Sequence, residues 1–204
     1  MCFLDFETIA SPIPLFDGTR PYQQIPFQYS LHKIEKEGGE IAHFEYLGDG
    51  PNKDVREYIA ENLVKQIPES ATTLCYNDDF EKNRIEELAN AFPQYNTQLM
   101  KRKNNIKDLL DIFSKGYYYS KKMGGSFSIK SVLPALFPNN QCLSYKELEG
   151  VQGGNAATEA YKKLKTNALS NEERENIRKQ LLDYCNLDTM AMVRIWEKLW
   201  EVSK

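Results

Sequence analysis

The stretch CFLDFETI, residues 2–9, combines an apolar strand pattern with two acidic residues. Successive side chains of a strand point to opposite faces, so Asp5 and Glu7 share one face while Leu4 and Phe6 share the other. Two neighbouring carboxylates repel each other, and a hard divalent cation between them would relieve that repulsion. The alternative interpretation is a strand that simply leaves the core into solvent. From this stretch alone, both interpretations stay open.

The whole chain has the size and composition of one domain with a substantial core. It has 204 residues, of which 41% are hydrophobic and 12% are aromatic. The formal net charge of -3 excludes a general basic coat, so nucleic acid binding would need local Lys and Arg clusters or bound metal. We therefore predict a single domain over residues 1–204. Its first strand begins at the second residue, which indicates a domain cut from a longer chain.

The four cysteines are scattered without any C-x-x-C spacing, at Cys2, Cys75, Cys142 and Cys185. This pattern is typical of a reduced intracellular protein rather than of a disulfide scaffold or a zinc site. No apolar run approaches the roughly 18 to 20 residues that span a bilayer, and no signal peptide precedes the first strand. We expect a cytoplasmic protein with no membrane partner.

The order of the expected elements predicts an α/β fold. Strands are expected at 2–7, 27–36, 41–47 and 71–76, with a proline-rich connector over 11–26. Helices are expected at 53–66 with Asn52 as its cap, and at 79–91, 104–113, 128–138, 157–165 and 171–200. Three antiparallel strands followed by parallel ones imply a mixed sheet flanked by helices.

Two later segments carry acids that we expect to converge with Asp5 and Glu7. YNDDFEKNRIEELA, residues 76–89, spans the end of the fourth strand and the start of the next helix. LLDYCNLDTMAM, residues 181–192, places Tyr184 and Asp188 four apart on one face of a helix. Carboxylates that converge at this density indicate two bound cations.

These segments resemble the motifs of the DEDD superfamily, the DnaQ-like 3′-5′ exonucleases with a ribonuclease H-like fold. DFET at 5–8 is similar to the first motif, Asp-x-Glu-Thr, and NDDFE at 77–81 is similar to the second, Asn-x-x-Phe-Asp. YCNLD at 184–188 is similar to the third motif in its tyrosine (DEDDy) form, Tyr-x-x-x-Asp.

A closer likeness covers nearly the whole chain. RPYQQIPFQYSLH at 20–32, SFSIKSVLPALFP at 126–138 and YCNLDTMAMV at 184–193 are similar to an uncharacterised bacterial family of such domains, also found in mycoplasmas. This likeness implies the same ribonuclease H-like fold.

The resemblance implies a metal-dependent 3′-5′ exonuclease that hydrolyses phosphodiester bonds at single-stranded or frayed DNA or RNA ends. In a two-metal site, one cation lowers the pKa of an attacking water and the other stabilises the leaving 3′ oxygen. By the resemblance, Asp5 bridges both cations, Glu7 and Asp188 hold the nucleophile-side cation, and Glu81 holds the other. The Tyr184 hydroxyl would orient the water. Mg²⁺ or Mn²⁺ suits such an oxygen site, whereas zinc favours His or Cys ligands.

The second motif departs from the superfamily at Glu81, where the superfamily has Asp. Either the longer side chain still reaches a metal, or Asp78 or Asp79 takes over. The motif spacing and the first turn of the helix favour Glu81. Asp78 and Asp79 also suit a helix N-terminus without any metal. Asp108 is either an acid near the pocket or a surface carboxylate, and it is left outside the predicted set.

Substrate contacts are expected beside the metals. We assign substrate binding to Phe6, Thr8, Asn77 and Phe80 in the motifs, and to Ser128 and Lys130, where GGSFSIKS (124–131) opens a helix. Tyr117 to Tyr119 with Lys121 and Lys122 form either a surface for a single strand or a solvated loop. His32 and His43 are expected to be hydrogen-bonded in the sheet rather than to bind metal.

Two other functions stay open. Glu81 is the sequence hint of a nucleic-acid-binding module with weakened catalysis. The third interpretation is a protein-interaction domain whose acids merely face solvent. An additional nuclease or helicase domain is the expected partner in a longer chain.

Overall fold

A five-stranded mixed sheet forms the centre of the chain in a computed structural model that describes residues 1–36, 38–138, 140, 143–164 and 168–204. The strand order is β3-β2-β1-β4-β5. The β1–β2 and β2–β3 pairs are antiparallel, whereas β1–β4 and β4–β5 are parallel. The strands are β1 (Cys2–Ile9), β2 (Ile25–Ile34), β3 (Ile41–Leu47), β4 (Thr73–Cys75) and β5 (Ile106–Asp108).

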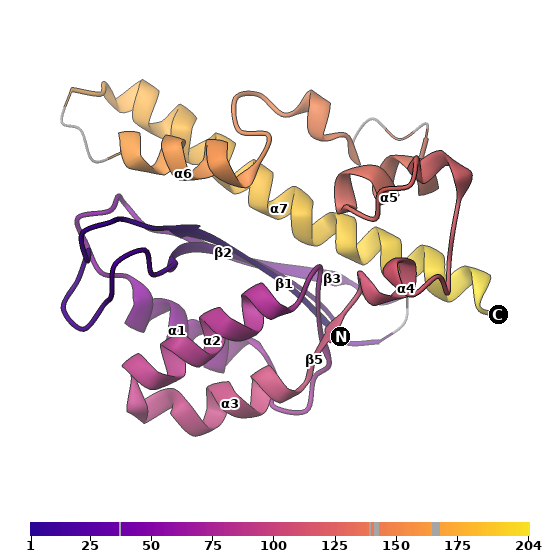
Figure 1. The fold of residues 1–204 in the computed structure, drawn as a ribbon, viewed down its shortest axis with the longest axis horizontal. Coiled ribbons are helices and arrows are strands. Elements are labelled where there is room, and N and C mark those ends of the chain that lie inside the picture. Colours follow the sequence, from indigo (N-terminus) through magenta and orange to yellow (C-terminus); the bar gives the residue numbers. More distant parts are fainter. Residues whose placement is uncertain (37, 139, 141–142, 165–167) are drawn as a thin grey trace.

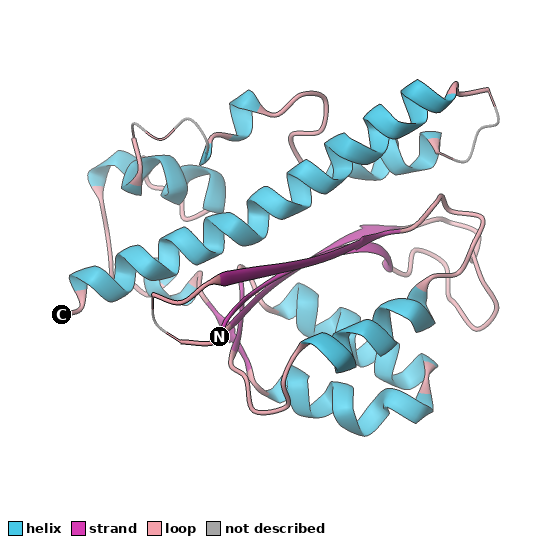
Figure 2. Cartoon of the chain, turned by 180° about the vertical axis from the view of Figure 1, so that it is seen from behind, coloured by secondary structure: helices cyan, strands magenta, loops and turns pink. Residues whose placement is uncertain are grey.

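Helices cover both faces of the sheet (Figure 1). On one side lie α1 (Arg56–Gln66), α2 (Asp79–Ala91) and α3 (Asn96–Asn104). On the other side lie α5 (Ile129–Leu136), α6 (Gly154–Lys163) and the long α7 (Asn171–Val202), which runs the length of the molecule (Figure 2). The shorter elements are η1 (Pro93–Tyr95), α4 (Asp111–Ser114), η2 (Lys121–Met123) and η4 (Tyr145–Glu147). The predicted α/β class, with a mixed sheet between helices, is confirmed.

The alternating pattern of β1 supplies two separate cores. Leu4 and Phe6 pack in the core between the sheet and α1, α2 and α3. Phe3 packs in the other core, under α7. Because side chains alternate along a strand, Asp5 and Glu7 lie on the same face as Phe3. The two acids therefore face α7, on the side of the sheet that also carries α5 and α6.

The predicted helix over 104–113 is wrong. Residues 106–108 form the edge strand β5, which pairs with β4 through Thr73 and Ile106, and α4 follows after a turn. A strand of three residues is too short to show an alternating pattern, so the apolar residues of this segment mimic helical spacing. Helix α3 was not predicted.

Helix α1 begins later than predicted. Its N-cap is Val55 and not Asn52. The Asp54 carboxylate accepts a hydrogen bond from the Arg56 backbone N–H at 3.0 Å and pairs with the Arg56 guanidinium at 2.7 Å. These bonds turn the chain into the helix at Arg56.

Some predictions fall on residues outside the described ranges: Glu37 in the turn between the second and third strands, Cys142, and Lys165 at the predicted end of α6. The cysteines Cys2, Cys75 and Cys185 are buried free thiols. Within the described part of the chain, no helix is long and apolar enough to cross a membrane.

Candidate metal centre

Three carboxylates from β1 and α7 converge on one point. One carboxylate oxygen each from Asp5, Glu7 and Asp188 lies within 4.8 Å of the others. Strand β1 presents its two acids on one face, and α7 crosses that face and brings Asp188 to them. The β1–β2 register shifts between Glu7 and Thr8, and such irregularities often lie beside active sites because they re-aim a side chain.

Glu81 is the fourth acid of the site. It lies in the first turn of α2, is 3% exposed, and its Oε2 atom has no hydrogen-bond partner among the described residues. Of the two competing acids, Asp79 is exposed to solvent and Asp78 pairs with Lys82 at 2.5 Å. Glu81 lines the same cleft as Asp5, whereas Asp78, although buried, is paired with Lys82, and neither Asp78 nor Asp79 lines that cleft. We call Asp5, Glu7, Glu81 and Asp188 the acid cluster.

Asp108, at the end of β5, holds the turn that leads to Glu81. Its Oδ1 atom accepts hydrogen bonds from the backbone N–H groups of Asn77 at 2.9 Å and Leu110 at 2.8 Å. Asn77 has a φ of 72°, a left-handed conformation that is uncommon for residues other than glycine. The Asp108 carboxylate stabilises this turn. Sequence reasoning missed this role because it did not recognise β5.

Burial makes every member of the acid cluster a weaker acid than usual. Burial, followed by the charge of Asp188, raises the pKa of Glu7 to about 8. Burial also raises the pKa of Glu81 to about 8 and that of Asp188 to about 6. The pKa of Asp5 rises well above its usual range through burial and then through the charges of the other three members.

This donor set fits a hard divalent cation. The cluster offers carboxylate oxygens, which Mg²⁺ and Mn²⁺ prefer, and one of them is buried without a partner. Glu7, Glu81 and Asp188 are 8%, 3% and 9% exposed, so they are not acids that merely face solvent. A bound cation would favour the ionised form of each member.

Two tyrosines reach Asp188. Tyr184 lies one helical turn earlier on the same face of α7, and its hydroxyl opposes the rise that burial causes in the pKa of Asp188. Tyr145, in η4, donates its hydroxyl hydrogen to Asp188 Oδ1 at 2.5 Å. Sequence reasoning predicted Tyr184 and missed Tyr145, because Tyr145 lies 43 residues before Asp188 and in no motif. The Cys185 thiol also lies 3.4 Å from Asp5 Oδ2.

A cleft of about 660 Å³ opens beside the acid cluster. Of the predicted substrate contacts, Thr8, Asn77 and Phe80 line it. Phe6 borders it, although its ring packs in the core below the sheet. Ser128 does not line this cleft: it is exposed at the start of α5, where its hydroxyl contacts Ser131 at 3.1 Å.

Lys130 lies beside the acids. Its Nζ atom is 5.1 Å from the centre of the Tyr145 ring and 5.3 Å from that of Tyr184, and it donates to the Gln152 carbonyl at 2.6 Å. Burial raises the pKa of Glu7, and the Lys130 charge opposes that rise. By contrast, Tyr117 and Tyr119 in the predicted loop are 76% and 61% exposed.

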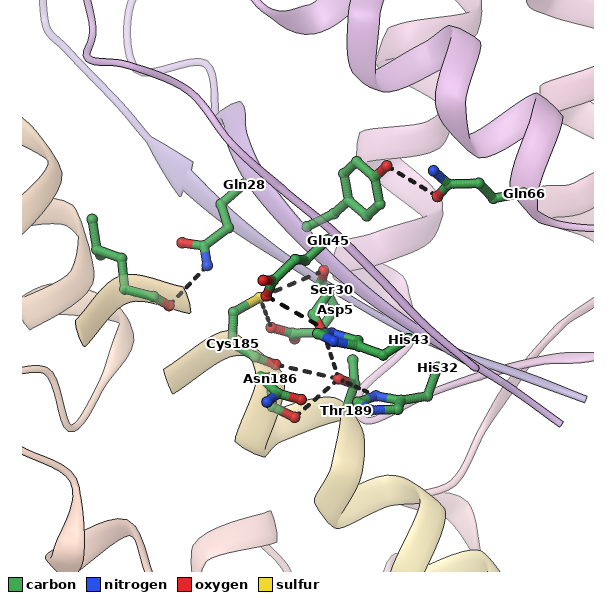
Figure 3. Close-up of polar contacts among 12 residues, drawn as sticks. Asp5, Gln28, Ser30, His32, His43, Glu45, Gln66, Cys185, Asn186 and Thr189 are labelled. Atoms are coloured by element: carbon green, nitrogen blue, oxygen red, sulfur yellow. Dashed lines mark hydrogen bonds and ion pairs between the residues drawn. The ribbon is translucent and has the colours of Figure 1, made fainter. Parts of the chain in front are cut away.

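A polar network ties α7 to the sheet next to Asp188 (Figure 3). Thr189 Oγ1 lies 2.8 Å from His32 Nδ1 and 2.7 Å from Ser30 Oγ, which in turn lies 2.9 Å from His43 Nε2. Burial lowers the pKa of His32 to about 4. Both histidines are therefore hydrogen-bonded residues of the sheet, as predicted.

The fold and the site together define an α/β protein with a carboxylate centre where β1, α2 and α7 meet. Residues 2–128 match the family described as "Domain of unknown function (DUF2779)", and the chain belongs to this family.

Two curated relatives from mycoplasmas are similar to the chain. It is 28% identical over 206 residues to "Uncharacterized protein MG366 homolog" of Mycoplasma pneumoniae. It is 29% identical over 214 residues to "Uncharacterized protein MG366" of Mycoplasma genitalium. Each match covers 95% of this chain but 31% of the relative, so the chain spans less than a third of their length. No solved structure matches the chain.

Proposed function

We propose that the chain is a metal-dependent 3′-5′ exonuclease of the DnaQ-like, ribonuclease H-like type, acting on single-stranded or frayed nucleic acid ends. The observation that carries this proposal is the acid cluster, which draws its members from three elements far apart in the sequence. The sheet supports it, because three antiparallel strands are followed by two parallel ones, the order that the motif resemblance implies.

The geometry suits a division of roles within the cluster. Asp5 groups with Glu7 and Asp188 and lines the cleft with Glu81, a position that would suit a carboxylate between two cations. Glu81 approaches from α2, while Glu7 and Asp188 form the remaining wall. Cations held by these residues would supply the activation of a water and the stabilisation of the leaving 3′ oxygen. Tyr184 lies against Asp188, where its hydroxyl would orient that water.

The walls of the cleft suit a nucleic acid end. Gly154 and Asn155, at the N-terminus of α6, line the cleft, and the backbone N–H groups of a helix N-terminus favour phosphate. Lys130 lies next to this helix end, since its ammonium would be 3.4 Å from a Cβ atom at Gly153. We propose that α6 and Lys130 hold the substrate phosphates, in place of the predicted contact at Ser128.

A cleavage assay with labelled oligonucleotides tests the proposal. Single-stranded DNA and RNA of matched sequence, labelled at either end, are incubated with the protein and Mn²⁺ or Mg²⁺, with a chelator as control. We expect a ladder of shortened products from the 5′ label and released mononucleotide from the 3′ label. Binding without shortening would instead favour a nucleic-acid-binding module with weakened catalysis. No shortening together with no saturable Mn²⁺ binding would favour the protein-interaction domain.

We also propose that the remaining length of the mycoplasma relatives carries an additional nuclease or helicase domain. The chain spans 31% of each relative, which leaves room for one or more further domains. A helicase partner would supply the single-stranded ends that the cleft accepts. Unwinding of a labelled duplex by a full-length relative, with ATP and without cleavage, tests this proposal.

A further inference from the structure

Tyr145 holds one oxygen of Asp188. Its hydroxyl lies 2.5 Å from Asp188 Oδ1, a short distance for a hydrogen bond to a charged carboxylate. The bond joins η4 to α7. Tyr145 belongs to neither the acidic motifs nor the sheet. Tyr145 therefore acts on a proposed metal ligand from outside the acid cluster.

The position of Tyr145 is itself fixed by its neighbours. The residue is 9% exposed, and its ring lies 6.3 Å from the ring of Tyr184. The Lys130 ammonium lies over both rings and is anchored by the Gln152 carbonyl. A tyrosine held on these sides keeps its hydroxyl aimed at Asp188.

A carboxylate oxygen that accepts a hydrogen bond is held in place and competes less well for a metal, so the bond at Oδ1 leaves Oδ2 as the better placed metal ligand of Asp188. Mg²⁺ demands near-ideal octahedral geometry and commonly takes one oxygen from a carboxylate, whereas Ca²⁺ has a larger, flexible shell and readily takes both. Hydrogen bonds to metal-binding carboxylates orient them and tune the affinity of the site.

We propose that Tyr145 is a positioning residue that restricts Asp188 to ligation through one oxygen and so favours Mg²⁺ over Ca²⁺. The inference rests on the proposed function, because it takes Asp188 as a metal ligand. It adds a residue that the motifs do not contain and a choice of cation that they do not explain.

Binding of each metal alone to Tyr145→Phe tests the inference. The substitution removes the hydroxyl and keeps the ring that packs under Lys130. We expect the dissociation constant for Mg²⁺, measured by displacement of Mn²⁺ in electron paramagnetic resonance, to rise by about ten-fold or more. The dissociation constant for Ca²⁺ should change little or fall, because Asp188 would be free to offer both oxygens. The ratio of the two dissociation constants is the readout, because a general loss of structure would weaken the binding of both cations alike.

Tyr29→Phe is the matched control. Tyr29 is also a buried tyrosine, its hydroxyl donates to Gln66 Oε1 at 3.0 Å, and it packs in the core between the sheet and α1, on the face away from the acid cluster. The control should leave the Mg²⁺ to Ca²⁺ ratio unchanged. Near-ultraviolet circular dichroism of both variants checks that they are folded.

The outcomes separate this inference from the proposed function. One outcome is that the unmutated chain binds Mn²⁺ while Tyr145→Phe raises the dissociation constants for Mg²⁺ and Ca²⁺ by the same factor, or changes neither. That result would overturn the positioning role and leave the metal centre standing. If the unmutated chain binds none of these cations, the metal centre itself is wrong and the inference falls with it.

A second measurement needs no variant of Tyr145. Infrared spectra of the unmutated chain with ¹³C-labelled aspartate carboxyls are recorded with Mg²⁺ and with Ca²⁺, and spectra of Asp188→Asn are subtracted. With Mg²⁺, the difference spectrum should show the widely separated carboxylate stretching bands of one-oxygen ligation. Closely spaced bands, as two-oxygen ligation gives, would contradict the inference.

Discussion

Glu81 is the side chain in which burial and charge conflict most directly. It is 3% exposed, one of its oxygens lacks a partner among the described residues, and its pKa is raised to about 8 from its ordinary 4.5. Burial contributes most to the rise, and the charges of Asp108 and Asp78 add to it. An ionised carboxylate in this position therefore destabilises the metal-free fold.

Glu81→Gln should separate stability from catalysis. We expect loss of nearly all metal-dependent cleavage, together with a higher free energy of unfolding of the metal-free protein. The gain should grow as the pH rises from about 4.5 to about 8, because the unfolded chain ionises Glu81 in this range while the folded chain keeps it protonated. Urea unfolding in the presence of a chelator measures the gain.

Asp79→Asn is the control for Glu81→Gln, because Asp79 is an exposed acid in the same helical turn. It should change neither cleavage nor the free energy of unfolding by much. If Asp79→Asn is inactive while Glu81→Gln cleaves like the parent, the assignment of the second motif is wrong. Glu81→Asp restores the superfamily residue with a shorter side chain, and we expect partial activity with a higher Mn²⁺ requirement.

At the residue scale, the sequence predicts what lies along one element and misses what only folding brings together. Asp5 and Glu7 alternate with apolar residues on one strand, so their shared face follows from the sequence. Tyr184 and Asp188 share a helix face for a similar reason. Tyr145 touches Asp188 only because η4 folds against α7, and no local pattern records that contact.

Helix α7 is held on the sheet by the hydroxyl of Thr189, and this contact sets the position of Asp188. Thr189→Val removes its hydrogen bonds, so the buried His32 Nδ1 loses its partner and Ser30 Oγ keeps only its bond to His43. We expect the free energy of unfolding to fall by about 1–3 kcal/mol. Thr158→Val is the control, since the Thr158 hydroxyl bonds a backbone carbonyl at the half-buried cleft wall. Equal losses in the two variants would show that the network does not fasten α7.

Lys130 joins α5 to the segment that opens α6. Lys130→Ala should weaken binding of a single-stranded oligonucleotide more than it lowers the maximal cleavage rate, because a cationic phosphate contact mainly positions the substrate. Fluorescence anisotropy with a labelled strand and cleavage under saturating substrate measure the two effects. Lys65→Ala, an exposed lysine of α1 on the other face of the sheet, is the matched control. If both variants bind equally well, the substrate path lies elsewhere.

At the element scale, length decides which elements the sequence predicts. The strands β1, β2 and β3 and the helices α2 and α7 are long enough for their apolar periods to repeat, and their predicted bounds lie close to the observed ones. Strand β5 has three residues, so its existence depends on pairing with β4 and not on any repeat. The error over 104–113 also hid the role of Asp108.

At the scale of the whole molecule, the acid cluster and the buried His32 act on stability in opposite directions. Raised pKa values of Glu7 and Glu81 mean that the folded chain binds more protons than the unfolded chain between about pH 4.5 and 8, so stability falls as the pH rises there. The lowered pKa of His32 means that the unfolded chain binds the extra proton between about pH 4 and 6.5, so stability rises with pH in that lower range.

Above pH 6.5, His32 is neutral in both the folded and the unfolded chain, so of these groups only Glu7 and Glu81 still change the stability with pH. We therefore expect the melting temperature of the metal-free protein to fall between pH 6.5 and 8. Saturating Mn²⁺ should reduce or abolish this fall, because the cation binds the ionised carboxylates. Thermal unfolding with a chelator and with Mn²⁺ measures both curves. A metal-free melting temperature that stays level or rises over this range would contradict the raised pKa values.

If cations held by the acid cluster drive the cleavage of nucleic acid, Asp5→Asn should remove that activity. Parent and variant are compared on one 5′-labelled single strand with Mn²⁺, after circular dichroism shows that both are folded. We expect a ladder of shortened products for the parent and none for Asp5→Asn, because the variant lacks the charge proposed to lie between both cations. A variant that keeps most of the parent's cleavage rate would contradict the two-metal centre.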